Sequence, residues 1–347
     1  MNNELTFWKD KKILVTGGAG YIGSHTVKEL TKRGFETVVY DNLEKGHREA
    51  VVDGEFVLGD LADLDTLRET FTKHRIDSVI HFAADSEVGE SVKNPAKYFQ
   101  NNVANGLNLL RVMLENGVKK IVFSSTAAVY GEPERIPILE SDKTLPTNPY
   151  GESKLIFENI LKYYELAYGL RYISLRYFNA AGADPDGLIG EDHNPETHLI
   201  PLVLQTALGL KDEVEIFGTD YDTPDGTCIR DYIHVTDLAE AHILALEALA
   251  KGGESKIYNL GNGNGYSVKE VIEVAKKVVR REIKTVLSER RQGDPSILVA
   301  SSEKIMRELG WKPKYEKLET IIETAWNWYK SNRAGWNMEI LYKRGDL

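Results

Sequence analysis

Residues 12–23 read KILVTGGAGYIG and decide the fold of the chain. The apolar run Lys12–Thr16 predicts a strand, and helical spacing follows over Ile22–Arg33. Glycines 17, 20 and 23 between them allow a tight turn and let backbone N–H groups approach a pyrophosphate at the start of the helix. Because a strand and a helix flank the glycines, the stretch is typical of a dinucleotide-binding βαβ unit and not only of a glycine-rich turn.

The alternation of strand and helix continues through the first half of the chain. Further strands are predicted at Thr37–Tyr40, Phe56–Leu58, Ser78–Phe82, Lys120–Ser124 and Arg171–Leu175, and helices at Leu64–Lys73, Lys97–Asn116 and Tyr150–Tyr168. Repeated βαβ units predict an α/β protein with a doubly wound parallel sheet, a Rossmann domain, over residues 1–180. We expect a smaller mixed α/β lobe over residues 181–347 that binds the substrate, with part of 229–262 packing back onto the first domain.

The composition and charge of the chain limit the kinds of partner that it is expected to bind. The 347 residues carry a formal net charge of -10 without a basic stripe, so neither nucleic acid nor an anionic membrane is an expected partner. The chain has no apolar run long enough to span a bilayer and no signal-peptide pattern, which favours a cytoplasmic protein.

The one cysteine, Cys228, is expected to be a packed side chain. No metal is predicted, because the histidines lack paired spacing and Asp220–Gly226 departs from a calcium loop.

An acidic residue follows the glycines at the spacing that NAD-binding proteins use. Asp41 ends the second strand about twenty residues further on, where a carboxylate accepts hydrogen bonds from ribose hydroxyls and repels a 2′-phosphate. NAD is therefore favoured over NADP. Two alternatives stay open: Asp41 as a plain turn residue, and neutralisation of a phosphate by Arg48. Asp60, after the strand Phe56–Leu58, is placed either to contact adenine or to cap a helix.

Tyr150 and Lys154 form a candidate catalytic pair. They lie four residues apart at the start of a predicted helix, so both side chains emerge on one face. A lysine ammonium near a phenol favours the phenolate, which lowers the tyrosine pKa from about 10 and lets it accept a hydroxyl proton. Such a pair also occurs by chance, but Thr126 lies at the carboxyl end of a predicted strand, where ligands bind in this architecture.

Together these motifs resemble the extended short-chain dehydrogenase/reductase family, and in particular its nucleotide-sugar epimerases. The likeness extends through Thr16–His25, Val79–Ala83, Val88–Ser91, Asn101–Val103, Tyr130–Gly131, Leu175–Asn179, Arg230–Val235 and Tyr258–Asn262. The resemblance implies transient oxidation at C4 of a UDP-hexose by tightly bound NAD, which interconverts UDP-galactose and UDP-glucose. It also implies a homodimer that pairs through the helices Lys97–Asn116 and Tyr150–Tyr168.

The resemblance also implies roles for individual residues. Tyr150 would be the base, Lys154 would lower its pKa and bond the nicotinamide ribose, and Thr126 would orient the substrate. The positions that match NAD contacts are Gly17, Gly20, Tyr21, Ile22, Gly23, Asp41, Asn42, Asp60, Leu61, Phe82, Ala83, Ala84, Asn101, Lys154 and Phe178. The positions that match substrate contacts are Thr126, Tyr150, Asn179, His198, Leu199, Arg230, Arg291, Asp294 and Leu298, with both arginines on the diphosphate.

Three positions depart from the family pattern or vary within it. His198 stands where the best-known epimerases carry asparagine, and Ser86 stands where some carry lysine, which puts the transfer in doubt at both positions. His198 as an ordinary loop histidine is the alternative. Leu298 occupies a gate where tyrosine excludes an N-acetyl group and a small residue admits it. Activity on UDP-N-acetylhexosamines is therefore an open possibility.

Other reactions on the same framework are less favoured. In the sugar 4,6-dehydratases Asp-Glu follows the threonine, whereas here Ala127 and Ala128 follow Thr126 and cannot move protons. A nucleotide-sugar decarboxylase shares the framework but acts on a uronate. A protein that binds NAD without turnover is a further alternative, against which the intact Thr126, Tyr150 and Lys154 argue.

Overall fold

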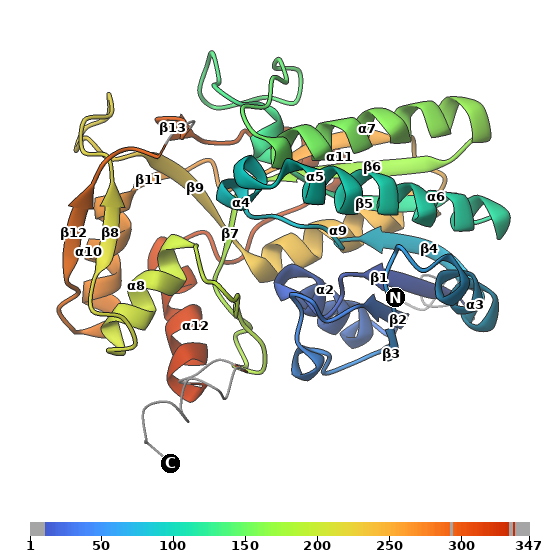
Figure 1. Ribbon diagram of the computed structural model, residues 1–347, viewed down its shortest axis with the longest axis horizontal. Helices are drawn as coiled ribbons and strands as arrows, with labels where there is room; N and C mark the ends of the chain where they lie inside the picture. Colours follow the sequence, from blue (N-terminus) through green and yellow to red (C-terminus); the bar gives the residue numbers. More distant parts are fainter. Residues whose placement is uncertain (1–10, 292–293, 333–335, 337–347) are drawn as a thin grey trace.

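A parallel sheet of seven strands organises the protein, in the order β10-β6-β5-β4-β1-β2-β3 (Figure 1). The structure is a computed structural model that describes residues 11–291, 294–332 and 336. The strands are β1 (Lys12–Thr16), β2 (Glu36–Asp41), β3 (Glu55–Leu58), β4 (Ile76–His81), β5 (Lys120–Thr126), β6 (Arg171–Tyr177) and β10 (Lys256–Leu260). Strand order reverses between β1 and β4, which opens a crevice at their carboxyl ends. The predicted doubly wound α/β class is confirmed.

Helices cover both faces of this sheet. α2 (Tyr21–Lys32) and α9 (Val235–Ala250) pack on one face, and α3 (Leu64–His74), α6 (Gly106–Glu115) and α7 (Pro149–Tyr168) pack on the other. Alternation along β1 divides its side chains between the two faces: Ile13 and Val15 join the core with α2 and α9, and Leu14 joins the core with α3, α6 and α7. Burial on both faces explains why the strands read as continuous apolar runs.

The predicted helix Lys97–Asn116 is present, but part of it is π-helical. After α4 (Val88–Lys93), the chain forms α5 (Pro95–Tyr98), a π-helical segment Phe99–Asn105 and then α6, and the backbone stays right-handed helical at both junctions. Inside the segment, the Asn102 amide accepts the Asp85 backbone N–H (2.8 Å) and donates to the Asp85 carbonyl (3.0 Å) and the Ser153 hydroxyl (3.0 Å). These bonds attach the segment to the loop after β4 and to α7, a common setting for a π turn near a functional site.

The second half of the chain forms a smaller lobe and then returns to the large sheet. Its remaining elements are β7 (Asn179–Ala181), α8 (Leu199–Ala207), β8 (Val214–Phe217), β9 (Ile229–His234), β11 (Gly265–Ser267), α10 (Val268–Val279), β12 (Thr285–Ser288), β13 (Ile297–Leu298), α11 (Glu303–Leu309) and α12 (Leu318–Ser331). β9 pairs with β7, β11 and β13, and α8, α10 and α12 share an apolar core. β10 pairs with β6 at the edge of the large sheet. The domain boundary at residue 180 stays a prediction.

Local signals explain several element ends. Ser267 caps α10, and Glu270 completes a capping box with it. α7 ends at Gly169, which adopts the left-handed conformation that glycine takes most easily. None of the helices that the structure describes is long and apolar enough to cross a membrane.

A buried ion pair joins β6 to α7. The guanidinium of Arg176 donates through Nε to Glu158 Oε1 (2.9 Å) and through Nη2 to Oε2 (2.5 Å), and the two side chains are 5% and 3% exposed. The Ser125 hydroxyl donates to the same carboxylate (2.5 Å), and Arg176 Nη1 donates to the Tyr130 hydroxyl (2.9 Å). The two charges are therefore satisfied by each other and by hydrogen bonds.

Arg176→Met should lower the free energy of unfolding by about 3–5 kcal/mol, because it leaves the Glu158 carboxylate buried without its cation. Urea unfolding followed by circular dichroism measures this change. Arg171→Met is the matched control: Arg171 lies in the same strand and pairs with Glu165 (2.6 Å), but its side chain is 51% exposed. Its expected cost is about 0–1 kcal/mol. Equal costs for the two variants would contradict the importance of burial here.

Candidate active site

One cavity of about 1020 Å³ lies over the carboxyl ends of the central strands and extends into the smaller lobe. Every residue that the sequence analysis placed in the catalytic, cofactor and substrate sets lines this cavity. Ser86 lines it too. The volume matches the upper end of the roughly 300–1,000 Å³ typical of ligand pockets, so it suits a large ligand or two ligands side by side.

The glycine turn after β1 presents bare backbone to the cavity. Gly17 has a φ of +71°, and a Cβ at this position would lie 2.5 Å from the backbone nitrogen of Ala83. A Cβ on Gly23 would lie 2.2 Å from the carbonyl oxygen of Gly17. Side chains are thus excluded at both positions. The N-terminus of α2 is left open to an anionic group such as a pyrophosphate.

Asp41 closes this turn from the end of β2. Its Oδ2 accepts the backbone N–H of Ala19 and its Oδ1 accepts that of Leu43, both at 2.9 Å. Burial raises the pKa of the Asp41 carboxyl, and these two N–H groups oppose the rise. Asp41 therefore has a structural role in the turn in addition to its place on the cavity wall.

The contacts of Arg48 and Asp60 distinguish between the roles considered for them, which were phosphate neutralisation by Arg48 and helix capping or adenine contact by Asp60. The Arg48 guanidinium lies over the ring of Phe56, 4.7 Å from its centroid, and donates to the Val51 carbonyl (3.4 Å), away from the cavity lining. That position favours NAD over NADP. The cap of α3 is Asp63, not Asp60. Asp60 lines the cavity and accepts from the Asn42 amide (2.7 Å).

Tyr150, Lys154 and Thr126 converge at the centre of the cavity. Tyr150 and Lys154 are buried in the first turns of α7, and Thr126 ends β5. Lys154 Nζ donates to the Ser124 carbonyl (2.8 Å) and lies 6.0 Å from the centroid of the Tyr150 ring. The Thr126 hydroxyl is hydrogen-bonded to the Tyr150 phenol. The expected geometry of the three side chains is present.

The electrostatics of the pair differ from the expectation. Burial raises the pKa of the Tyr150 phenol above 10, and the hydrogen bond with Thr126 opposes the rise only in part. Burial also lowers the pKa of Lys154 to about 7, against the attraction of the Glu158 carboxylate. The predicted low pKa of Tyr150 was therefore wrong for the chain by itself, because desolvation of the phenol is the largest cause of its shift.

The substrate side of the cavity carries the two arginines. Arg230 in β9 is 11% exposed and donates through Nη2 to Asp294 Oδ1 (2.6 Å). The Arg291 guanidinium lies 3.9 Å from the centroid of the Phe217 ring. Leu298 in β13 is the strand partner of Arg230, so the gate position lies beside it. Two guanidinium groups that line the same cavity suit a diphosphate.

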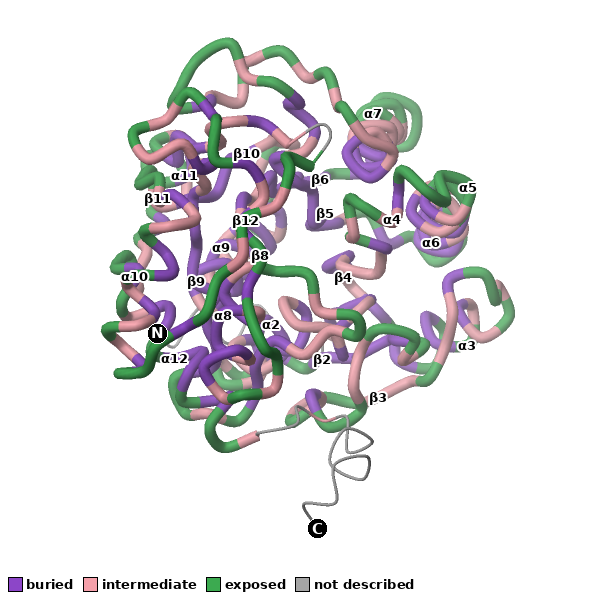
Figure 2. Tube along the Cα trace, turned by 60° about the vertical axis from the view of Figure 1, so that its left-hand side comes forward, coloured by how far each residue is buried: buried purple, intermediate pink, exposed green. Residues whose placement is uncertain are grey.

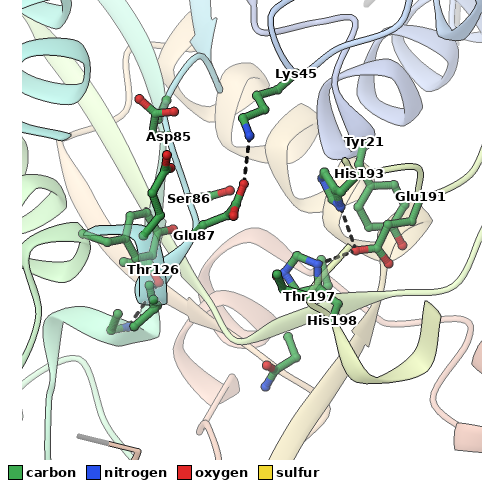
Figure 3. Close-up of a pocket in the computed structure, with 18 of the residues that line it drawn as sticks. Tyr21, Lys45, Asp85, Ser86, Glu87, Thr126, Glu191, His193, Thr197 and His198 are labelled. Carbon is green, nitrogen blue, oxygen red and sulfur yellow. Dashed lines mark hydrogen bonds and ion pairs between the residues drawn. The ribbon is translucent and has the colours of Figure 1, made fainter. Parts of the chain in front are cut away.

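The sequence analysis missed a cluster in the loop between β7 and α8. Glu191, His193, Glu196 and His198 bring their ligand atoms within 4.8 Å of one another (Figure 3). The spacing of the histidines in the sequence did not reveal this cluster, because a folded loop and not a helix joins them. Although burial disfavours the charged ring, the two carboxylates raise the pKa of His193 to about 9.

Tyr177 and Cys228 were also not assigned to the site, but both line the cavity. The Tyr177 hydroxyl is hydrogen-bonded to the Ser124 hydroxyl, and burial raises the pKa of the Tyr177 phenol. Its place at the carboxyl end of β6 was the signal available in the sequence. Cys228 is buried, as expected of a packed thiol.

The fold and the cavity define a dinucleotide-binding α/β enzyme with room for a second ligand beside the cofactor. Residues 13–261 match the model of the NAD dependent epimerase/dehydratase family. A UDP-glucose 4-epimerase of Halalkalibacterium halodurans is 61% identical over 327 residues, which are 94% of this chain and 98% of the relative. The chain belongs to the NAD dependent epimerase/dehydratase family, whose cofactor is NAD, and its relatives there are UDP-glucose 4-epimerases.

Solved structures agree with this placement. The UDP-glucose 4-epimerase from Brucella ovis in complex with NAD is 50% identical with a TM-score of 0.89, over 91% of this chain and 97% of that chain. The UDP-Glc/GlcNAc 4-epimerase from Campylobacter jejuni is 45% identical with a TM-score of 0.81, over 92% of this chain and 99% of that chain.

Proposed function

We propose that the enzyme interconverts UDP-glucose and UDP-galactose by inverting C4 of the hexose. The observation that carries the proposal is the meeting, in one cavity, of the Tyr150 phenol and the Thr126 hydroxyl with the glycine turn and two arginines. Close relatives over nearly the whole chain are named for this reaction. Ala127 and Ala128 after Thr126 disfavour dehydration, since neither can exchange a proton.

The chain's own residues supply the proton chemistry. Tyr150 in its phenolate form accepts the proton of the sugar 4-hydroxyl, and Thr126 orients that hydroxyl. NAD, held at the glycine turn, would supply the acceptor and donor of the C4 hydride and, while oxidised, a positive charge in the site. Tyr150 then returns its proton to the new hydroxyl. Atoms and electrons balance without an outside oxidant, so the cofactor need not leave.

Different residues of the cavity would bind the cofactor and the substrate. The turn at Gly17–Gly23 would hold the pyrophosphate of NAD, and Asp41 would accept from a ribose. Arg230 and Arg291 would hold the diphosphate of the UDP-sugar. Such placed cations explain how a protein with a net charge of -10 binds an anionic substrate.

The direct test is conversion of UDP-galactose to UDP-glucose by the purified protein without added NAD. We expect turnover with NAD that copurifies with the protein. A protein that holds NAD but converts neither sugar would contradict the enzyme proposal. Release of a 4-keto-6-deoxy sugar would identify a dehydratase instead, and action on a UDP-uronate alone would identify a decarboxylase.

Leu298→Tyr should separate two substrates. The larger side chain should leave UDP-galactose turnover near the native rate and lower turnover of UDP-N-acetylgalactosamine by roughly tenfold or more, because it fills the space for the N-acetyl group. The ratio of kcat/KM for the two substrates measures the effect. Leu298→Met, which nearly conserves volume, is the control. Equal loss on both substrates would remove Leu298 as the gate.

We propose that the exposed side of α7 packs against a second copy of this chain. Tyr163 and Leu166, three residues apart, are 68% and 74% exposed there, and Figure 2 shows one side of α7 as exposed and the other as buried. Such apolar groups at helical spacing suit a helix-to-helix interface with an identical partner. Sedimentation equilibrium should give twice the chain mass. Action in the cytoplasm stays a prediction.

A further inference from the structure

The loop that joins β7 to α8 gathers two carboxylates and two imidazoles at the rim of the cavity. The Glu191 and Glu196 side chains are 5% and 4% exposed, and the His193 and His198 side chains are 26% and 50% exposed. Figure 3 shows a ring nitrogen of each histidine directed at the same Glu191 oxygen. The mechanism proposed above uses neither carboxylate.

The spacing of the four groups is close to that of a tetrahedral metal site. His198 Nδ1 lies 2.9 Å from Glu191 Oε1 and 3.1 Å from Glu196 Oε1. His193 Nδ1 lies 3.3 Å from Glu191 Oε1 and 3.7 Å from Glu196 Oε2. Bonds of about 2.0–2.1 Å from zinc to nitrogen or oxygen put neighbouring ligand atoms about 3.3 Å apart in a tetrahedron. The four quoted distances lie near this value, and the full set of ligand atoms, spread over up to 4.8 Å, would have to contract around an ion.

Two atoms of the cluster take part in ion pairs but make no hydrogen bond. His193 Nδ1 and Glu196 Oε2 are buried and make no hydrogen bond within the described part of the chain. Buried polar atoms are rarely left in this state. A cation between the four groups would satisfy both atoms at once.

The surroundings hold the ligands in place. Glu196 Oε1 accepts the backbone N–H groups of Thr197 and His198, both at 2.8 Å, which leaves Oε2 free to turn toward an ion. The ring edge of Tyr21 packs on His193, with centroids 6.2 Å apart at 89°. Outer contacts of this kind orient the ligands of metal sites.

We propose that Glu191, His193, Glu196 and His198 bind one Zn²⁺ ion per chain. Imidazole nitrogen and carboxylate oxygen are donors that Zn²⁺ accepts in four-coordinate sites. The ion fixes residues 191–198, from which α8 begins, and so positions His198 and Leu199 on the wall of the cavity. The site goes beyond the proposed reaction, and metal binding and turnover can each fail without the other.

The test is calorimetric titration of the chelator-treated, full-length protein with Zn²⁺ alone. The native protein should bind one ion. His193→Gln and Glu196→Gln should each weaken binding by more than the roughly 10–100-fold that loss of an outer-shell contact costs. His74→Gln is the matched control, because His74 Nδ1 pairs with Glu55 at 3.1 Å outside the cluster. It should bind as the native protein does.

Co²⁺ gives a second measurement that does not depend on the variants folding well. Bound Co²⁺ should show the intense d–d absorption of a tetrahedral site without a thiolate charge-transfer band, which would point to Cys228 instead. Lack of stoichiometric Zn²⁺ binding by the native protein, undiminished affinity of His193→Gln, or a thiolate band would each overturn the proposal. The cluster would then be an ion-pair network only.

Discussion

Tyr150→Phe should lower kcat for UDP-galactose by on the order of 10²–10⁴-fold, the usual contribution of a positioned general base, while NAD stays bound. The phenyl ring keeps the buried volume of the native side chain and its edge contact with Tyr98, whose ring centroid lies 6.5 Å away. Only the hydroxyl that meets Thr126 is lost. The defect should therefore fall on the chemical step and not on folding or cofactor binding.

Steady-state kinetics and the NAD content of the purified variant measure the two parts of this prediction. Tyr164→Phe is the control, since it removes a hydroxyl from the same helix where burial is only partial and the neighbour is Tyr168. It should keep the native kcat. A near-native rate for Tyr150→Phe would remove Tyr150 as the base, and loss of NAD would show that its role is structural.

Lys154→Met should lower kcat/KM at neutral pH by more than about tenfold and move the acidic limb of the pH–rate profile upward by about 1–3 units. Burial already raises the pKa of Tyr150, and a cation beside the phenol favours the phenolate. Removing that cation raises the phenol pKa further, so a larger fraction of the base stays protonated at a given pH. The rate should recover only at higher pH.

The pH profile distinguishes this role from a structural one. Lys154 Nζ also bonds the Ser124 carbonyl (2.8 Å), and losing a buried bond could cost stability without changing the limb. A lower rate with an unmoved limb would therefore mean that Lys154 only supports the structure. Lys162→Met removes an exposed ammonium from the same helix and should leave both quantities unchanged.

The fold was largely predictable because its signals are local. β1 has the predicted bounds, and α7 begins one residue earlier than predicted. The π-helical segment within the predicted helix Lys97–Asn116 was not predicted, because its bonds from Asn102 to Asp85 and Ser153 join residues that are distant in the sequence. Periodicity carries no information on such contacts.

The sequence predicted where the site residues lie but not the direction of the pKa shift of Tyr150. All assigned residues line one cavity, since the carboxyl ends of parallel strands meet at one edge. The pKa of Tyr150 was predicted with the wrong sign because it depends on burial, which the four-residue spacing to Lys154 does not reveal. The roles of the individual residues stay predictions. The cluster of Glu191, His193, Glu196 and His198 was not predicted, because its loop has no periodic sequence pattern.

Because β10 pairs with β6, the large sheet is incomplete until the second half of the chain has been synthesised. Residues 1–180 leave the ribosome with β6 as an open edge, and its neighbour Lys256–Leu260 follows some 80 residues later. Contacts so far apart in sequence form slowly, and an unpaired strand edge is a template for aggregation. A fragment that ends near residue 180 would keep that edge open permanently. The first half of the chain thus needs the second to become a stable folding unit.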